Sequence, residues 1–406
     1  MRLLKRLPKV PMEDEERHAI WLEVFFDLVF VLAVSQLADY LREHLTLPGV
    51  LAFAGLFVVV WWTWLSFTFF ADLFDPDHVS YRLIMLVVML LSIMLAVNIG
   101  DALGEHAAVF IVLSTLLQAI LTGLYLWGRR DANVRILATR FAIGFAIATL
   151  FWLLSLWIAA PFRYILWTLA LLIEIGTPML VAFMLKKRPF YVSHIPERLG
   201  LFTIIVLGES IIRIGTGLVG TPWQVTSVIT AVASFLIAAC LWWLYFDRVD
   251  AEVMKRSFTE QYEHKRELLR SFAWSYIHVL VFSGLAATSV GISLVIEQVG
   301  KPLPLETGLT LGLGCAITLL AITLIQQIGP QSLSLRELIS RACVIVLAVI
   351  LAFVGTWLGP MLVTVVLAFL FALITTVEAV MLYRQKEDIV QLEQQEQGTP
   401  ETLLAP

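Results

Sequence analysis

Twelve runs of mainly apolar residues, each about 20 long, fill most of this 406-residue chain. About 20 such residues are needed for a helix to cross the hydrocarbon core of a bilayer. Charged residues make up only 15% of the chain, against about 25% in soluble domains. The sequence therefore predicts an all-α polytopic transmembrane bundle. The predicted spans are 20–40, 48–71, 82–99, 106–127, 136–158, 163–185, 199–219, 223–246, 271–296, 305–327, 338–357 and 361–383.

Lys and Arg are distributed unequally between the two ends of these spans. With the N-terminus placed in the cytoplasm, the cytoplasmic side holds 24 of the 28 Lys and Arg residues. Arg42, Arg163 and Lys301 fall on the opposite side, and Arg213 lies inside a span. Basic residues concentrate in the cytoplasmic loops of membrane proteins. The sequence therefore predicts a multi-pass protein of the inner (plasma) membrane with both termini in the cytoplasm.

The two halves of the chain resemble each other. Glu23 in WLEVFF matches Glu197 in IPERLG at an offset of 174 residues, and each half has six spans. Both halves would then lie the same way up, as parallel repeats do in several transporter folds. The predicted units are a cytoplasmic segment 1–19, a first six-helix repeat 20–187, a second six-helix repeat 196–385 and a disordered cytoplasmic tail 386–406.

Two sequence stretches carry a family resemblance. WLEVFFDLVFVLAVSQL at 21–37 and ERLGLFTIIVLGESII at 197–212 resemble motifs of the bacterial low-temperature-requirement A (LtrA) family. The resemblance extends over roughly 15–385. It implies a multi-pass bacterial membrane protein, and it brings no catalytic residues with it.

Glu209 and Arg213 lie inside the predicted span 199–219, which follows a first acid–base pair, Glu197 and Arg198. An ionised side chain at the centre of a bilayer costs about 2.5–3.5 kcal/mol on insertion scales. The spacing of four residues places Glu209 and Arg213 on one helical face, where they can pair. A buried pair of this kind often adds little net stability, which favours a functional role for Glu209 and Arg213 over a purely structural one. The position that matches Glu209 in the first half is Ser35, so the charge belongs to one half only.

Acidic residues in other spans are further candidates for a proton or cation pathway. Glu23 and Asp27 share one face of the first span; Glu174 lies in the middle of the sixth, and Glu378 matches it in the twelfth. Two acids close together favour a proton or cation site. Alternatively, these acids pair with arginines and fix the packing of the helices. The match between Glu23 and Glu197 favours such a structural role for those two residues.

His278, in the ninth span, is a candidate proton relay, because histidine titrates near neutral pH. A single histidine in an apolar helix is more often a hydrogen-bonded core residue. Acids also cluster at the cytoplasmic ends of the second and eighth spans, where carboxylates could bind a hard cation or pair with nearby Arg and Lys. The matched acids are Asp72, Asp75 and Asp77 in the first half and Asp247, Asp250 and Glu252 in the second.

These features favour a proton- or cation-coupled secondary transporter or ion-conducting protein, acting on a small substrate that the sequence does not identify. Glu209 would be the acid that changes protonation, Arg213 its counter-charge, and Asp27 and Glu174 parts of a hydrated path. The alternatives are an intramembrane enzyme that uses buried carboxylates or a divalent metal, and a non-catalytic sensor or scaffold. We find no nucleotide-binding, hydrolase or metalloprotease motif and no basic block suited to nucleic acid. The expected partner is the lipid bilayer, with no cofactor.

Overall fold

The computed structural model describes residues 21–74, 78–132, 134–184, 194–219, 221–248, 265–330 and 332–397. Over these ranges the chain is helical and contains no strand. Twelve of the described helices are long and apolar enough to cross a membrane, which confirms the predicted all-α bundle. The helices are α1 (Trp21–Glu43), α2 (Leu47–Phe74), α3 (Val79–Val97), α4 (Ala107–Gly128), α5 (Arg135–Leu154), α6 (Phe162–Met184), α7 (Ile195–Val219), α8 (Val225–Phe246), α10 (Lys265–Glu297), α11 (Leu305–Ile328), α12 (Leu335–Leu358) and α13 (Pro360–Gln397), with two short 3-10 helices, Ile99–Asp101 and Ser155–Trp157.

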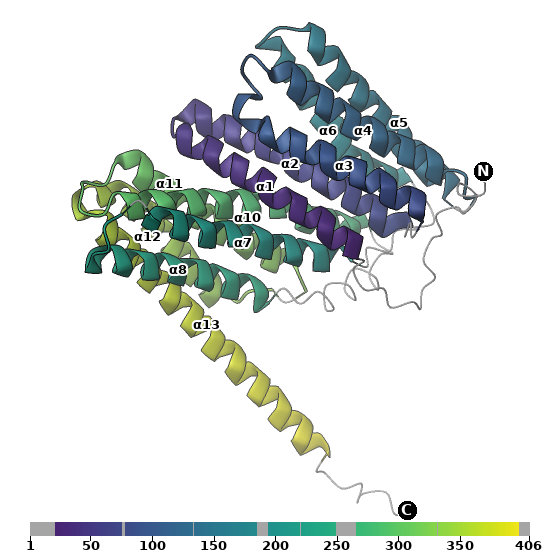
Figure 1. The fold of residues 1–406 in the computed structure, drawn as a ribbon. Coiled ribbons are helices and arrows are strands. Elements are labelled where there is room, and N and C mark those ends of the chain that lie inside the picture. The colour runs from purple at the N-terminus through teal and green to yellow at the C-terminus, as the bar shows by residue number, and fades with distance from the viewer. Residues whose placement is uncertain are drawn as a thin grey trace, which may run out of the picture.

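The helices form two adjoining groups. In Figure 1, α1 to α6 occupy the upper part of the bundle and α7 to α13 the lower part. We call these the first and second groups. Helices α1 and α2 of the first group contact α7 and α10 of the second, and α6 also contacts α10. These five helices make up the group interface, so side chains far apart in the sequence meet there.

Successive helices run in opposite directions, because most of the connections between them are short. We call the end of the bundle where α1 begins the Trp21 end, and the opposite end the Glu43 end. The Trp21 end also contains the start of α7 and the end of α2, where the backbone N–H of His194 donates a hydrogen bond to Asp72 Oδ1 (3.0 Å). This alternation places Asp27 and Arg198 near one end of the bundle, and Asp39 and Arg213 toward the other.

Local signals fix where the last two spans begin. Ser334 Oγ accepts a hydrogen bond from the backbone N–H of Glu337, and the Glu337 carboxylate accepts one from the N–H of Ser334 (2.7 Å). This reciprocal capping box satisfies two backbone donors at the start of α12. Gly359 follows α12 with φ of 80°, a conformation that favours glycine. Pro360 then opens α13, where its missing N–H is not needed.

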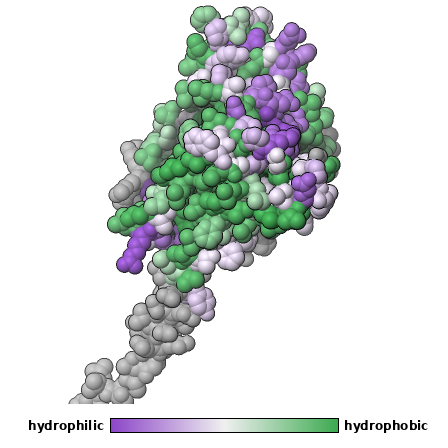
Figure 2. Space-filling model, turned by 90° about the vertical axis from the view of Figure 1, so that its left-hand side faces the viewer, coloured by the Kyte–Doolittle hydropathy of each residue, from purple (hydrophilic) through white to green (hydrophobic). Residues whose placement is uncertain are grey.

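Large hydrophobic side chains cover much of the outside of the bundle. Leu83 is 59% exposed, Ile350 48% and Phe369 63%. Figure 2 shows broad hydrophobic areas on the face that it presents, with hydrophilic residues gathered in a smaller region. Apolar patches of this extent mark contact with lipid or with other proteins. Together with the twelve apolar helices, this surface fits a bilayer environment.

Glycines allow α11 and α12 to approach closely. A Cβ atom added at Gly308 would lie 2.6 Å from the carbonyl oxygen of Ala352, and one at Gly312 would lie 2.7 Å from that of Ala348. The pair forms a GxxxG motif, which in membranes marks close helix contacts. In contrast, a Cβ at Gly208 in α7 would meet no atom within 4 Å.

We expect Gly312→Ala to destabilise the bundle by about 1–3 kcal/mol, because the added methyl group forces the α11 and α12 backbones apart. The matched variant Gly208→Ala should be neutral or slightly stabilising, because alanine favours helix by about 1 kcal/mol over glycine. Thermal unfolding of both variants in detergent measures the difference. Equal midpoints for the two variants would contradict close α11–α12 packing as the reason for Gly312.

The last helix is longer than the span predicted from the sequence. Helix α13 continues to Gln397, well past the predicted end of the last span at 383. The added segment, RQKEDIVQLEQQEQ, is rich in Gln, Glu and Lys. These residues have high helix propensity and can extend an existing helix into water. Residues 1–20 and 398–406 lie outside the described residues.

Candidate functional site

Asp27 of α1 and Arg198 of α7 form an ion pair across the group interface. The exposed fraction is 1% for Asp27 and 2% for Arg198. The guanidinium donates to Asp27 Oδ1, and the indole N–H of Trp64 on α2 donates to the same oxygen (2.6 Å). Oδ2 of Asp27 is also buried, and it accepts no hydrogen bond from the described residues. Three helices thus hold one carboxylate that is fully removed from solvent.

Aromatic rings surround the charge of Arg198. Its guanidinium carbon lies 5.9 Å from the ring centre of Phe26 and 5.8 Å from that of Trp64. Cation–π contacts of this kind are attractive within about 6 Å. The sequence pairs Arg198 only with its neighbour Glu197, but the structure turns Arg198 inward toward Asp27. Glu23 is also buried, at 8% exposure, one helical turn from Asp27.

Glu197 lies at the edge of this region. Its side chain is 45% exposed, and its Oε2 lies 3.5 Å from Nδ1 of His194. The matched residue Glu23 is buried instead. The two glutamates therefore occupy different environments despite their equivalent places in the two sequence halves.

Arg213 binds two carboxylates on different helices. Its Nε donates to Glu209 Oε1 on α7 (2.7 Å), which confirms the pairing expected from their spacing. One of its terminal nitrogens lies 2.7 Å from Asp39 Oδ1 and 3.3 Å from the carbonyl oxygen of Ser35, both on α1. Glu209 is 1% exposed, whereas the side chain of Asp39 is 45% exposed. Of these three residues, Asp39 thus lies at the surface of the group interface, and Arg213 and Glu209 lie in its interior.

A layer of aromatic side chains separates these two ionic clusters. Phe202 lies one turn after Arg198, and its ring centre is 6.5 Å from Phe30, 4.3 Å from Trp64 and 4.8 Å from Phe282. All four rings are at most 1% exposed. Arg198 and Glu209 are eleven positions apart on α7, or about 16 Å along the helix axis. The interface thus contains two charged clusters with a dry aromatic layer between them.

A further ion pair crosses the group interface toward the Glu43 end. Arg42 of α1 donates to both carboxylate oxygens of Glu297 on α10, at 3.0 and 2.9 Å. Ser293 Oγ donates to the same glutamate (2.9 Å). Both charged side chains are about one third exposed. The pair ties α1 to α10 next to the Arg213 cluster.

Glu174 in α6 has neutral partners. Gln118 Nε2 of α4 donates to its Oε2 (2.8 Å), and Trp152 Nε1 of α5 donates to its Oε1 (2.9 Å). Glu174 is 1% exposed. Arg140 of α5 matches Arg341 of the second half at an offset of 201. It makes no ion pair with Glu174, and a buried nitrogen of Arg140 makes no hydrogen bond within the described part of the chain. Glu174 is therefore a buried carboxyl held by one amide and one indole.

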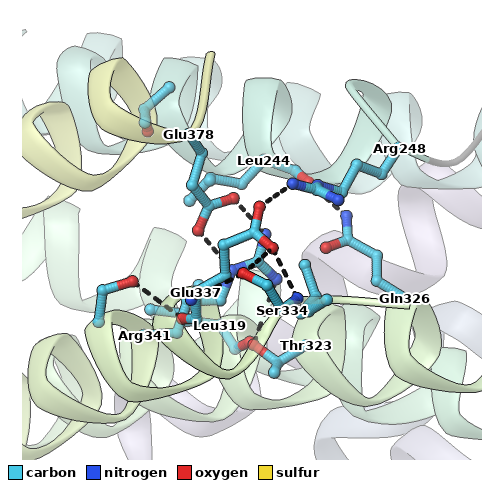
Figure 3. A network of polar contacts seen from close by, with 12 residues as sticks. Leu244, Arg248, Leu319, Thr323, Gln326, Ser334, Glu337, Arg341 and Glu378 are labelled. Carbon is cyan, nitrogen blue, oxygen red and sulfur yellow. Dashed lines mark hydrogen bonds and ion pairs between the residues drawn. The ribbon is translucent and has the colours of Figure 1, made fainter. Parts of the chain in front are cut away.

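The matching residues in the second group form a complete ion pair, shown in Figure 3. Arg341 of α12 donates to both oxygens of Glu378 on α13, at 2.8 and 2.7 Å. Thr323 Oγ1 of α11 accepts from a third guanidinium nitrogen (3.3 Å). Arg341 is 0% exposed and Glu378 3%. Such bidentate geometry is the strongest form of a carboxylate–guanidinium contact.

A second ion pair lies beside it in Figure 3. Arg248, just after α8, binds the carboxylate of Glu337, which forms the capping box of α12 with Ser334. Gln326 Nε2 of α11 donates to the carbonyl oxygen of Leu244 in α8 (2.6 Å). These contacts join α8, α11 and α12 at the Trp21 end. We attribute to them a packing role within the second group.

His278 lies in the core of the bundle with both ring nitrogens hydrogen-bonded. Nδ1 lies 2.8 Å from the carbonyl oxygen of Trp274, and Nε2 lies 3.0 Å from the hydroxyl of Tyr245. A carbonyl can only accept, so Nδ1 carries the proton and Nε2 accepts from Tyr245. His278 is 0% exposed, and its contacts fit the structural reading better than a proton relay.

The two matched acidic clusters are only partly described. Asp72 is 8% exposed at the end of α2, whereas Asp247 is exposed at the end of α8. The other members, Asp75, Asp77, Asp250 and Glu252, lie outside the described residues. Among the described residues, no group of three His, Cys, Asp or Glu side chains is arranged to hold a metal ion.

Several contact residues do not appear among the sequence candidates. Arg213 contacts Asp39, and Asp27 accepts a hydrogen bond from Trp64. Glu174 accepts hydrogen bonds from Gln118 and Trp152. Asp39 could have been found, because it matches Arg213 at the offset of 174 that relates Glu23 to Glu197. The other three are neutral residues, and only their position in the fold distinguishes them from ordinary core residues.

Comparisons with known proteins place these features in a family context. A family model described as "Bacterial low temperature requirement A protein (LtrA)" matches residues 18–380. A protein of Rhizobium meliloti (strain 1021), named "Uncharacterized protein RA0937", is 29% identical over 293 residues, which cover 68% of this chain and 69% of that protein. No solved structure matches the chain. The family match includes both helix groups and every ionic cluster described above.

Proposed function

This chain belongs to the bacterial low temperature requirement A protein (LtrA) family, and we propose that it is a proton- or cation-coupled secondary transporter or ion-conducting protein of the cell membrane. The observation that carries the proposal is the pair of ionic clusters at the group interface. Asp27 with Arg198, and Glu209 with Arg213 and Asp39, each join α1 to α7. Ionisable residues inside membrane spans are costly, and they mark ion and proton pathways by default.

The aromatic layer between the clusters supports this function. A continuous polar path would leak ions, whereas hydrophobic constrictions gate conduction by excluding water. In this proposal the packed rings of Phe30, Trp64, Phe202 and Phe282 act as such a constriction. Each ionic cluster could then open toward its own side of the membrane in turn.

We propose further that the chain is built from two repeats, 20–187 and 196–385. In both groups the first helix contacts the second and third, and neighbours from the third helix onward contact in sequence order. Transporters built from repeats place their binding sites where the repeats meet. Asp39 and Arg213 occupy matching positions of α1 and α7 and bind each other there (2.7 Å). In this proposal the ion pair lies close to the axis that relates the two repeats.

The chemistry of Glu209 suggests how coupling works. A proton arriving at the carboxylate neutralises it and weakens its hydrogen bond with Arg213, which keeps its charge and its contact with Asp39. Oε2 of Glu209 is buried, and it accepts no hydrogen bond from the described residues, so it is the oxygen that receives the proton. Once Glu209 is neutral, Arg213 is held by Asp39 of α1 alone, and this change in the charges that join α7 to α1 would let one half of the bundle rock against the other. Asp27 and Glu174 would take part further along the path.

From the distribution of Lys and Arg we propose that both termini, and thus the Trp21 end, face the cytoplasm. Asp39 then faces the opposite side of the membrane, and its half-exposed carboxylate is the entrance for the proton or cation. Arg42 and Glu297, which lie beside it, would tune the charge of this entrance.

Proteoliposomes that contain the purified protein test this function. We expect wild-type protein to collapse an imposed pH gradient with at least one cation in a panel, and Glu209→Gln to fall to the level of protein-free vesicles. Glu306→Gln is the matched control, because Glu306 is an exposed glutamate in the first turn of α11. Equal flux in wild type and Glu209→Gln would contradict the role of Glu209, and no flux in wild type would contradict the proposed function.

A further inference from the structure

A groove with a volume of about 520 Å³ runs along the outside of the first group between α3 and α4. Its volume falls within the range of about 300–1,000 Å³ that is usual for small-ligand pockets. Its walls are mainly apolar, and several of its lining residues are at least partly exposed. It therefore opens toward the lipid that surrounds the bundle. The lining residues are Ser80, Ile84, Val87, Ile120, Gly123, Leu124, Trp127 and Arg130.

The groove exists because α3 and α4 do not pack as their counterparts do. In the second group, α10 and α11 approach closely, and a Cβ at Gly291 would lie 2.5 Å from Cα of Leu311. A Cβ at Gly314 would likewise lie 2.6 Å from the backbone nitrogen of Thr288. On α4, a Cβ at Gly123 would meet no atom within 4 Å. Glycines thus allow α10 and α11 to pack closely, whereas the glycine on α4 lies beside open space.

The polar residues of the groove gather at its Trp21 end. Ser80 is the second residue of α3, and Arg130 stands two residues after the end of α4. Arg130 is exposed and lines this end of the groove. Trp127 lies one turn earlier, at the level where indole rings favour the membrane interface. The apolar part of the groove extends from there toward the middle of the span, to Val87 and Ile120.

We infer that this groove binds an anionic phospholipid, with the phosphate of the headgroup at Arg130 and an acyl chain along Ile84, Val87 and Gly123. The charge and the geometry are complementary to such a lipid. A guanidinium matches a phosphate in shape and charge, and basic pockets between spans bind anionic headgroups. The apolar walls suit one acyl chain, and Gly123 leaves room for it. This site is separate from the ionic clusters of the group interface.

Native mass spectrometry of the full-length protein, titrated with phosphatidylglycerol or phosphatidylcholine, tests the inference. We expect the wild type to prefer phosphatidylglycerol. Arg130→Gln should weaken that binding about fivefold, as expected for one arginine beside anionic lipid. Arg129→Gln is the matched control, because Arg129 is also exposed but does not line the groove. Equal losses in the two variants would overturn the site and indicate general surface attraction.

A second variant tests the apolar part of the groove. Gly123→Leu would fill the space beside α4. We therefore expect this variant to lose the binding of both phosphatidylglycerol and phosphatidylcholine in the groove. Gly176→Leu on α6 is its control, since a Cβ there also meets no atom within 4 Å. Glycerol 3-phosphate carries the phosphate of the headgroup without an acyl chain, so it tests whether the chain is needed for binding. We expect that it does not displace phosphatidylglycerol. Full displacement would contradict a lipid site. Unchanged lipid binding by Gly123→Leu would also overturn the inference.

Discussion

Replacing Asp27 by asparagine is expected to lower the free energy of unfolding by about 3–5 kcal/mol, which is the usual cost of removing one partner of a buried ion pair. Asparagine keeps the shape of the side chain and can still accept from the indole of Trp64. What it removes is the charge opposite Arg198, a side chain that is only 2% exposed. The penalty therefore comes from a buried guanidinium left without its counter-charge.

A change at Arg198, the ion-pair partner of Asp27, tests whether the ion pair causes this loss of stability. The double variant Asp27→Asn with Arg198→Met should recover most of the lost stability, because it leaves no unpaired charge. Unfolding in mixed detergent micelles, followed by far-ultraviolet circular dichroism, compares the variants. If Asp27→Asn does not fold, recovery of folded protein in the double variant would show equally that the unpaired charge of Arg198 causes the destabilisation. A double variant no more stable than Asp27→Asn would show that the ion pair is not the source of the effect.

Arg341→Met is expected to have a similarly large effect, a loss of about 3–5 kcal/mol, whereas Arg140→Met should cost less than about 1 kcal/mol. The two arginines match in sequence at an offset of 201. Arg341 makes a bidentate contact with Glu378, which becomes a buried unpaired carboxylate when the arginine is removed. Arg140 leaves no such partner behind, because Glu174 is held by Gln118 and Trp152.

Thermal midpoints of the two single variants, measured in the same detergent, test this difference. A further variant, Arg341→Met with Glu378→Gln, should regain stability relative to Arg341→Met alone. Equal destabilisation by Arg140→Met and Arg341→Met would contradict the conclusion that only the second group keeps this pair. It would also remove the reason to regard Glu174 as a carboxyl without a cationic partner.

The contrast between Arg140 and Arg341 is accompanied by different connections between the paired helices. Glu174 and Glu378 match at an offset of 204, whereas the arginines match at 201. Between α5 and α6 the chain forms the 3-10 helix Ser155–Trp157 and a loop, whereas Gly359 alone separates α12 from α13. The two helix pairs are therefore joined differently, and Glu174 contacts Gln118 and Trp152 where Glu378 contacts Arg341.

Contacts between residues of one helix could be predicted from the sequence. The pairing of Glu209 with Arg213 follows from a spacing of four residues, which any regular helix turns into a contact. The twelve spans likewise follow from runs of apolar residues, because the thickness of a bilayer fixes the length of a spanning helix. The end of α13 at Gln397 did not follow from hydrophobic length, because Gln, Glu and Lys have high helix propensity and can extend a helix beyond its apolar part.

The sequence by itself determined that this chain is a bundle of twelve membrane helices with charges buried inside it, since hydrophobic length and helical spacing are local properties. The tertiary structure decided which of those charges meet. Asp27 and Arg198 are separated by 171 positions, and Asp39 contacts Arg213 only because α1 packs against α7. Which faces of two helices come together depends on the packing of the whole bundle, and no local pattern in either helix encodes it.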